Sequence, residues 1–409
     1  MARICVIRQW NFPNDPRLGR EVGALARAGY DVDVICVKWP DQPLFERSGR
    51  LAVFRVPISR RRGGRVRYVV EFATFMVAAT LLVALLAPFR RYAVVQVNSI
   101  PDSLVFVSLV PRLLGARVLL DLHECMPEFF AMKYGLAPRH RLVRLLAWIE
   151  QSSIRFADFV VTCTDQMRER FVERGAPAAK VAVVLNSADE RINDPTRFAP
   201  CPGSPGRFVL IYHGTLEERF GPDTLVRAVG LLKDEIPGLQ LRIFGDGMLR
   251  PALESLAIEL GISSRVSISR GWAPLPDLLA AIASADAGVV PTKRDWYREL
   301  TLANKMFDLI AMRKPAIVGR TRAVEAYFDD SCFEMFESGS EHDLARAIRE
   351  LYADPERRQR LVRRAAERSE PYRWVHQAKR YLDIVDRLTA PRNARDAWPA
   401  AIREAIENR

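Results

Sequence analysis

The sequence predicts an α/β protein with two parallel-sheet domains that face each other across a cleft, and C-terminal helices that cross back to the first domain. Apolar runs typical of strands alternate with helical patterns in both halves of the chain, which favours βαβ units and parallel sheets. A stretch rich in Pro and Gly at 198–207 separates the two series, as a linker would. The length of 409 residues suits two domains better than one.

The first domain is predicted to span residues 1–197. Its first helix, within 17–30, places Leu18, Val22 and Leu25 on one face, and Gly29 suits the C-cap. Strands are expected within 2–10 and at 31–37, 51–57, 92–98, 117–123, 158–163 and 180–186.

The second domain, 208–375, is predicted to repeat this alternation, and residues 376–409 to form helices that pack back towards the N-terminal domain. Ser340 and Asp343 resemble a capping box at the start of one of its helices. Strands are expected at 208–214, 239–247, 265–271, 287–292 and 315–320, and helices at 222–236, 248–262, 274–286, 301–313 and 340–352. Ligands of open parallel sheets bind at the carboxyl ends of the strands, so functional residues are sought there.

The composition, 49% hydrophobic and 27% charged, is that of a soluble globular protein. Six scattered cysteines without metal-ligand spacing argue for reduced thiols in a cytoplasmic protein and against a disulfide framework or a zinc site. The N-terminus turns polar too soon for a signal peptide.

A net charge of +12 suits nucleic acid, an anionic membrane or phosphorylated substrates. Nucleic acid is disfavoured, because no recognition module is visible and the basic clusters are not interleaved with aromatic residues.

An uncharged apolar segment lies between Glu71 and Arg90 and nearly reaches the length of a transmembrane helix. Spanning conflicts with the topology, because the strand at 92–98 has to join the same sheet as the earlier strands. The alternatives are a buried crossover helix and a helix lying in the interface of an anionic membrane. Its apolar character all round and its arginine-rich flanks favour the second. Residues 60–91 are therefore a predicted contact with the inner face of the cell membrane.

The segment 301–318, TLANKMFDLIAMRKPAIV, carries the strongest chemical pattern. Read as a helix, it gathers Asn304, Lys305 and Asp308 on the face opposite its apolar residues. Free amides at the start of a helix favour an anion, so the backbone of 301–303 could bind a pyrophosphate, with Lys305 adding charge. Asp308, one turn on, could accept hydrogen bonds from ribose hydroxyls. The alternative is an ordinary amphipathic helix with a solvated polar face.

This segment resembles the donor-site signature of glycosyltransferase family 4, whose members have the GT-B fold of two Rossmann-like domains. The resemblance covers most of residues 1–390, with its motifs in the expected order. The family's ribose-binding glutamate falls on Asp308, a second family acid falls on Leu300, and a family glycine is replaced by Arg313. The matching positions are Leu302, Asn304, Lys305, Phe307, Ala311, Lys314 and Pro315, and Ala303 lies among them.

Two further segments of the second domain resemble the donor site of the same family. In YHGTLEERFG, Gly214 would allow close backbone approach, Arg219 would hold the donor diphosphate, and Phe220 stands where the family often has a lysine. In FGDG, Gly245 and Gly247 would shape a loop near the nucleotide base.

In the first domain, DLHE places His123 after a strand, where the family has a histidine that reaches the transferred sugar. Glu124 follows it. The loop containing NDPRLGRE resembles a family variant in which Asp15 and Arg17 hold the acceptor or the donor phosphate.

The resemblance implies a retaining glycosyltransferase that moves a sugar from a nucleotide-sugar, with UDP expected rather than GDP, to a glycan or lipid-linked acceptor in surface polysaccharide or glycolipid synthesis. Arg219 and Lys305 would stabilise the leaving diphosphate, Asp308 would anchor the ribose and His123 would support the sugar. No cofactor or metal is expected beyond the nucleotide-sugar co-substrate. Two alternatives stay open: a non-catalytic glycosyltransferase-like partner subunit, and a GT-B sugar-nucleotide epimerase.

Overall fold

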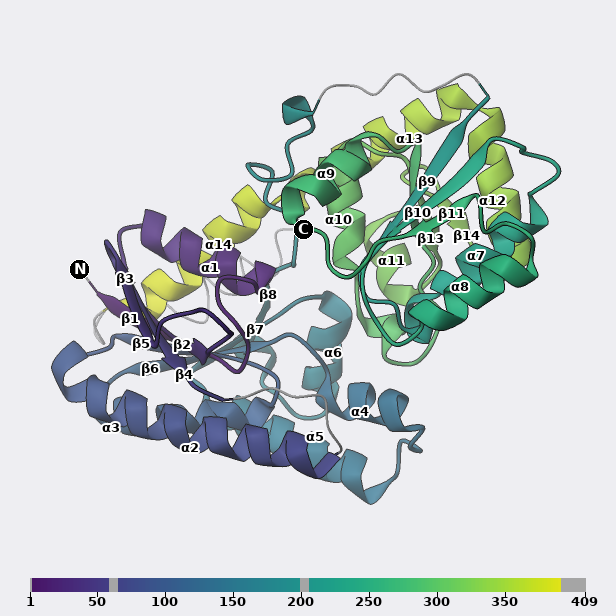
Figure 1. Cartoon of the computed structure of the whole chain (residues 1–409). Coiled ribbons are helices and arrows are strands. Elements are labelled where there is room, and N and C mark those ends of the chain that lie inside the picture. The colour runs from purple at the N-terminus through teal and green to yellow at the C-terminus, as the bar shows by residue number, and fades with distance from the viewer. Residues whose placement is uncertain (1, 59–64, 199–205, 391–409) are drawn as a thin grey trace. The chain divides into compact units, whose positions relative to one another are not determined.

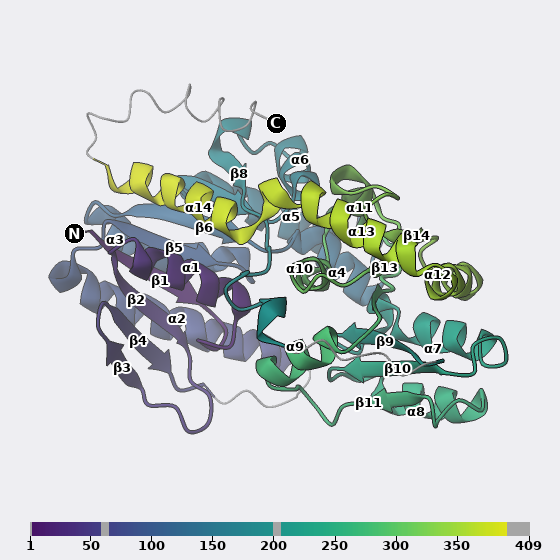
Figure 2. The same ribbon diagram turned by 90° about the horizontal axis from the view of Figure 1, so that it is seen from above.

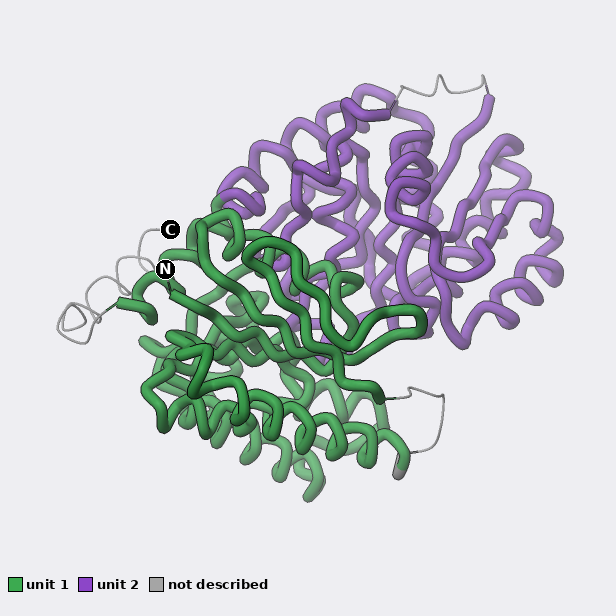
Figure 3. The backbone as a smooth tube through the Cα atoms, turned by 60° about the vertical axis from the view of Figure 1, so that its left-hand side comes forward, with its two compact units in different colours: residues 1–185, 376–409 green, residues 186–375 purple. Residues whose placement is uncertain are grey.

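The computed structural model describes residues 2–58, 65–198 and 206–390, and it divides into two compact units. Unit 1 comprises residues 1–185 and 376–409, and unit 2 comprises residues 186–375 (Figures 1 and 3). The predicted linker and the last residues lie largely outside the described ranges, as do Arg60, Arg61 and Arg62. The predicted alternation of strands and helices in two α/β halves is confirmed.

Unit 1 contains an eight-stranded sheet in the order β3-β4-β2-β1-β5-β6-β7-β8. All neighbours pair in parallel except β3, which forms an antiparallel edge with β4. The sequence does not indicate β3, because its four residues are all exposed and carry no apolar alternation. The strands are β1 (Arg3–Arg8), β2 (Asp31–Val37), β3 (Phe45–Ser48), β4 (Leu51–Val56), β5 (Val94–Asn98), β6 (Arg117–Leu122), β7 (Phe159–Thr162) and β8 (Val181–Val183).

Helices cover both faces of this sheet, which is why β5 is buried along its whole length and β6 everywhere but at its first residue. The layer with α1 and α14 lies on one face, and the layer with α2, α3 and α5 lies on the other (Figures 1 and 2). The helices are α1 (Pro16–Arg27), α2 (Arg65–Arg90), η1 (Asp102–Ser108), α3 (Leu109–Leu113), α4 (Met126–Tyr134), α5 (Arg141–Phe156), α6 (Asp165–Glu173) and η2 (Ala178–Lys180).

The final described helix, α14 (Trp374–Thr389), packs on unit 1 from His376 onwards. The hydroxyl of Tyr381 on α14 donates a hydrogen bond to Gln96 on β5, and Tyr30 bonds to Asp386. The prediction that the chain returns to its first domain is therefore confirmed for α14.

The boundary predicted after residue 197 is wrong, because the units divide between Leu185 and Asn186. The segment 186–197 belongs to unit 2, since its side chains bond there. Glu190 accepts hydrogen bonds from Arg373 and from the backbone of Trp374, and Asn193 donates to Asp308 at 3.0 Å. The segment carries little local signal, and these long-range contacts decide its place.

Unit 2 contains a six-stranded parallel sheet in the order β11-β10-β9-β12-β13-β14. Aliphatic side chains of the strands and helices form its core. The strands are β9 (Phe208–His213), β10 (Leu239–Phe244), β11 (Val266–Ile268), β12 (Ala287–Val290), β13 (Ala316–Gly319) and β14 (Glu334–Phe336). The helices are η3 (Pro195–Arg197), η4 (Glu218–Phe220), α7 (Pro222–Leu231), α8 (Arg250–Glu259), α9 (Leu275–Ala283), η5 (Arg298–Leu300), α10 (Asn304–Ala311), α11 (Arg322–Tyr327), α12 (Glu341–Ala353), α13 (Pro355–Arg368) and η6 (Glu370–Tyr372).

Arg313 ends α10 in a left-handed backbone conformation, with a φ of 54°. Its amide donates to Ile310 and the amide of Lys314 donates to Leu309, a pattern in which glycine is the usual residue. Arg313 thus carries the strain that its Cβ imposes in this region.

We expect Arg313→Gly to stabilise the protein by about 1 kcal/mol, because glycine adopts this φ without strain. Thermal unfolding of unit 2 should shift upwards by a few degrees. Arg227→Gly provides the control, since Arg227 is an exposed residue inside α7 and its replacement should destabilise the helix by about 1 kcal/mol. Equal destabilisation by both changes would contradict the prediction.

Candidate functional site

Lys305 lies at the start of α10 and is buried, with 8% of its surface exposed. Its ammonium lies 3.9 Å from the centre of the Tyr212 ring, and a β-carbon at Gly214 would lie 3.1 Å from it. Among the described residues the ammonium has no hydrogen-bond acceptor. Burial, followed by the charge of Arg298, lowers the pKa of Lys305 to about 7. The alternative interpretation, an ordinary helix with a solvated polar face, does not hold for Lys305, because its side chain is buried beneath the turn that follows β9.

Three cations surround the ring of Phe220. The guanidinium of Arg219 lies 4.9 Å from its centre, that of Arg298 4.4 Å, and the ammonium of Lys305 5.4 Å. Arg219 also pairs with Glu217 at 2.7 Å. The sequence indicated Arg219 and Lys305 but not Arg298, which η5 brings in from the residues before the motif. Arg298 supplies a second guanidinium beside the position where the family often carries a lysine.

The helix containing the motif begins later than predicted, at Asn304 and not at Thr301. Residues 301–303, including Leu302, precede the helix; Thr301 and Ala303 are extended, and Ala303 is the N-cap with no side-chain hydrogen bond to the first turn. The amides at this helix start therefore have no capping side chain, and they lie on the same turn as Lys305. Asn304 is exposed and accepts a hydrogen bond from Asn186 at 2.8 Å.

Asp308 lies one turn further along α10 and is partly exposed. Its carboxylate contacts the Nε2 atom of His213 at 3.1 Å and accepts a hydrogen bond from Asn193 at 3.0 Å. Sequence reasoning missed both partners. His213 ends strand β9, a position where functional groups collect, and that was the available signal.

Gly245 and Gly247 form a turn that packs against the loop after β9. A β-carbon at Gly245 would lie 1.8 Å from the carbonyl oxygen of Gly214, and one at Gly247 would lie 2.3 Å from that of Leu216. Only glycine fits such close contacts between two backbones. These glycines therefore fix the loop that carries Gly214.

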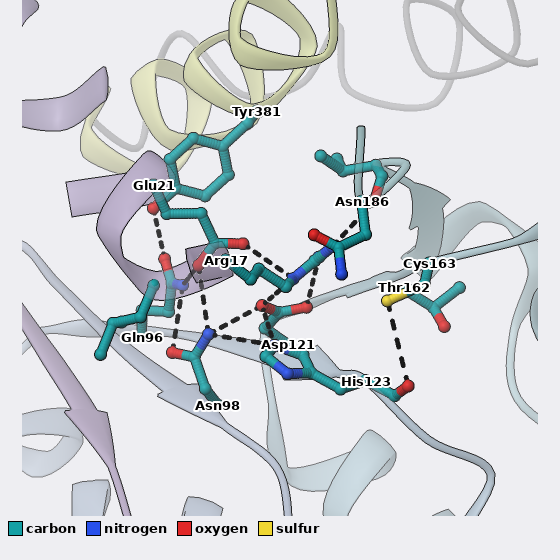
Figure 4. A network of polar contacts seen from close by, with 12 residues as sticks. Arg17, Glu21, Gln96, Asn98, Asp121, His123, Thr162, Cys163, Asn186 and Tyr381 are labelled. Atoms are coloured by element: carbon teal, nitrogen blue, oxygen red, sulfur yellow. Dashed lines mark hydrogen bonds and ion pairs between the residues drawn. The ribbon is translucent and has the colours of Figure 1, made fainter. Parts of the chain in front are cut away.

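In unit 1, a buried polar network surrounds His123 at the end of β6 (Figure 4). The Nε2 atom of His123 lies 2.7 Å from the Asp121 carboxylate, and Arg17 binds the same carboxylate at 2.8 and 3.0 Å. Burial lowers the pKa of His123, so the ring is neutral at neutral pH. Burial, the largest single effect, opposes the ionisation of Asp121, but the charge of Arg17 together with the interactions of His123 and the hydrogen bonds from both residues outweighs it and holds the Asp121 pKa well below its usual range. A neutral His123 thus donates from Nε2 to an ionised Asp121, which leaves Nδ1 as an acceptor.

The same network ties together the helices and strands of unit 1. Glu21 on α1 accepts hydrogen bonds from Gln96 and Asn98, and burial followed by the charge of Asp121 raises its pKa to about 8. Tyr381 on α14 reaches it through Gln96 (Figure 4).

Two predicted acceptor contacts take structural roles here. Asp15 is buried and caps α1, accepting hydrogen bonds from the amides of Arg17 and Leu18. The prediction of Arg17 as an acceptor contact is corrected, because its guanidinium is buried against Asp121, Glu21 and the carbonyl of Val184. Glu124 is partly exposed next to His123.

Within the described ranges no three His, Cys, Asp or Glu side chains gather into a metal-binding group.

Comparison with known proteins assigns both halves of the chain to glycosyltransferase domains. A "Glycosyl transferase 4-like domain" model matches residues 16–187, and a "Glycosyl transferases group 1" model matches residues 207–354. A lipopolysaccharide core biosynthesis glycosyltransferase, LpsE of Rhizobium meliloti, is 30% identical over 225 residues, which are 53% of this chain and 60% of that protein. The chain thus aligns with less than two thirds of the length of this relative.

Solved structures share the fold over nearly the whole chain. Sucrose-phosphate synthase from Thermosynechococcus elongatus superposes with a TM-score of 0.75 over 95% of this chain and 99% of its own, at 20% identity. HepE of Anabaena, solved in complex with UDP-glucose, gives a TM-score of 0.69 over 94% of this chain and 100% of its own, at 15% identity. By its two domain matches, its relatives and its fold, the chain belongs to the GT-B glycosyltransferases of the family 4 kind.

Proposed function

We propose that this protein transfers a sugar from a nucleotide-sugar donor with retention of anomeric configuration. The observation that carries the proposal is the buried ammonium of Lys305, which has no described hydrogen-bond acceptor and lies beneath the backbone of Gly214. A buried cation without an anion costs stability, so a fold that keeps one at a helix start is suited to bind an anionic group there.

A donor diphosphate fits this site chemically. Lys305, Arg219 and Arg298 supply positive charge around Phe220, and the uncapped amides of α10 supply donors. When the bond from the anomeric carbon to the diphosphate oxygen breaks, negative charge grows on that oxygen, and these groups stabilise it. The bond electrons leave with the diphosphate, and an acceptor hydroxyl attacks the same face of the sugar and passes its proton to the departing diphosphate oxygen. The protein's own cations carry the charge stabilisation in this proposal, so no metal is invoked.

Asp308 and His123 are assigned to the two ends of the donor. Asp308 accepts hydrogen bonds from the ribose hydroxyls, with His213 and Asn193 fixing its orientation. His123 binds a hydroxyl of the transferred sugar through Nδ1, because its Nε2 is directed to Asp121.

We further propose a UDP-sugar donor and a glycan or lipid-linked acceptor, with the enzyme working in the cytoplasm at the inner face of the cell membrane. UDP is favoured because HepE, of the same fold, is solved with UDP-glucose. A role in surface polysaccharide or glycolipid synthesis is favoured because LpsE acts in lipopolysaccharide core biosynthesis.

Calorimetric titration with UDP, GDP and ADP tests the donor site. We expect UDP to bind most tightly, and Asp308→Ala to weaken binding about tenfold through the lost ribose hydrogen bonds. Lys233→Met, which removes an exposed cation of the same unit, should bind as the wild type does. Absence of binding for all three nucleotides would overturn the proposal in favour of a non-catalytic partner subunit.

Proton NMR of the reaction tests its type, since the anomeric couplings of donor and product report retention or inversion. A product with the donor's configuration supports the proposal, whereas isomerised donor formed without acceptor would assign the chain to the epimerases.

A further inference from the structure

The helical layer formed by α2, η1, α3 and α5 in unit 1 has an unusually apolar outer face. Helix α2 is long and apolar enough to cross a membrane by length and composition, since an 18-residue stretch within Arg67–Arg90 has a mean hydropathy of 2.3. One line of α2, containing Phe75, Ala79, Val83 and Ala87, is buried in unit 1. That packing fixes α2 to the protein and excludes it from spanning a bilayer on its own.

The opposite line of α2 is apolar as well, where a helix on a water-exposed surface would carry polar side chains. Leu81, Leu85 and Phe89 follow one another at intervals of four residues, and Phe89 exposes 88% of its surface. The neighbouring helices also expose large apolar side chains: Leu113 on α3 is 78% exposed and Trp148 on α5 is 65% exposed. We define the apolar face as the exposed apolar side chains of α2, α3 and α5, of which the most exposed are Val77, Leu81, Leu85, Phe89, Leu113 and Trp148.

These residues belong to one layer. Helices α2 and α5 both pack against η1, and α3 continues η1 and contacts α2. Figures 1 and 2 show α2, α3 and α5 on the side of the sheet away from α14. Contiguous exposed apolar surfaces of this kind mark sites of interaction.

The exposed charged residues around the apolar face are predominantly positive. Exposed cations lie on and before α5, at Arg139, Arg141, Arg144 and Arg155. The described acidic residues of α2, η1, α4 and α5 are all buried or partly buried, namely Glu71, Asp102, Glu128 and Glu150. A surface that combines apolar side chains with flanking arginines is complementary to anionic phospholipid headgroups above acyl chains.

We propose that the apolar face docks on an anionic bilayer, with α2, α3 and α5 lying in the interface of one leaflet. Trp148 lies at the headgroup level, where indole rings are favoured, and Arg141 and Arg144 pair with lipid phosphates. This surface extends the predicted contact at 60–91 to α3 and α5, which the sequence did not indicate. The inference is independent of the sugar-transfer proposal, because it concerns lipid binding alone.

Vesicle flotation with the full-length protein tests the proposal. We expect binding to vesicles of phosphatidylcholine and phosphatidylglycerol, and weaker binding to phosphatidylcholine alone. The triple variant Leu81→Gln, Leu85→Gln, Trp148→Gln should bind the anionic vesicles at least about tenfold more weakly. Arg141→Gln with Arg144→Gln should lose about tenfold on anionic vesicles and little on neutral ones.

Ile258→Gln with Leu231→Gln is the matched control, since both residues are exposed apolar side chains of unit 2, Ile258 at 70%. This control should bind vesicles like the wild type. Should the triple variant fail to fold, quenching by brominated lipid supplies the second measurement, because Trp148→Phe should remove most of the quenched fluorescence. Unchanged binding by a folded triple variant would overturn the proposal. So would a soluble dimer that the triple variant dissociates, which would assign the face to a second copy of the chain.

Discussion

Replacing Lys305 with methionine should weaken UDP binding about a hundredfold, because a charge-assisted contact to the diphosphate is lost from a buried position. The same change should stabilise the nucleotide-free protein by about 2 kcal/mol, since methionine fills a similar volume without burying an ammonium that lacks an anion. Thermal unfolding with and without UDP measures both effects. A structural role for Lys305 predicts the opposite, a loss of stability without UDP.

The pKa of Lys305 adds a pH dependence to this result. With a pKa of about 7 the side chain is largely neutral above pH 8 in the free protein, and anion binding favours its charged form. Nucleotide binding should therefore take up a proton, and the affinity should fall as the pH rises from 7 to 9. Calorimetry in buffers with different ionisation enthalpies measures the uptake, and Lys305→Met should abolish it.

Arg298 offers an independent check on the same site. Arg298→Gln should weaken UDP binding about tenfold if Arg298 supplies the second cation beside Phe220. Arg294→Gln is the matched control, because Arg294 lies on the same segment and is engaged with Glu299. Equal effects from the two changes would speak against a specific role for Arg298.

The second large effect is expected at His123. His123→Ala should lower kcat about a hundredfold and leave the affinity for UDP unchanged, because the imidazole is assigned to the sugar and not to the nucleotide. His342→Ala, an exposed histidine of α12, should leave both quantities unchanged. A parallel loss of UDP affinity in His123→Ala would place the residue at the nucleotide instead.

Asp121 should act on turnover through His123. Asp121→Asn removes the charge that holds Nε2 as the donor, so we expect about a tenfold loss in kcat. It also leaves Arg17 buried without its main carboxylate partner, which should lower the unfolding temperature. A stable variant with full turnover would remove Asp121 from the mechanism.

The features of this protein that depend on local sequence pattern could be predicted from the sequence. Alternating strand and helix periods identify the two sheets, because periodic apolar residues report which side of an element is buried. The motifs around Gly214, His123 and Asp308 follow strands or lie on a short helix, so their order along the chain is enough to recognise the family. The placement of 186–197 escaped this reasoning, since that segment is held by contacts to residues more than a hundred positions away.

The sequence by itself determined the fold class and the family, and it indicated most of the residues of the proposed donor site. The tertiary structure alone decided how those residues are used. It buries Lys305 beneath the loop after β9, brings Arg298 to Phe220 and His213 to Asp308, and directs Arg17 to Asp121 in place of an acceptor. It also divides the apolar surface of α2 into a packed line and an exposed one. The physical reason is that charge, burial and exposure depend on neighbours distant in sequence, which periodicity and motif spacing do not encode.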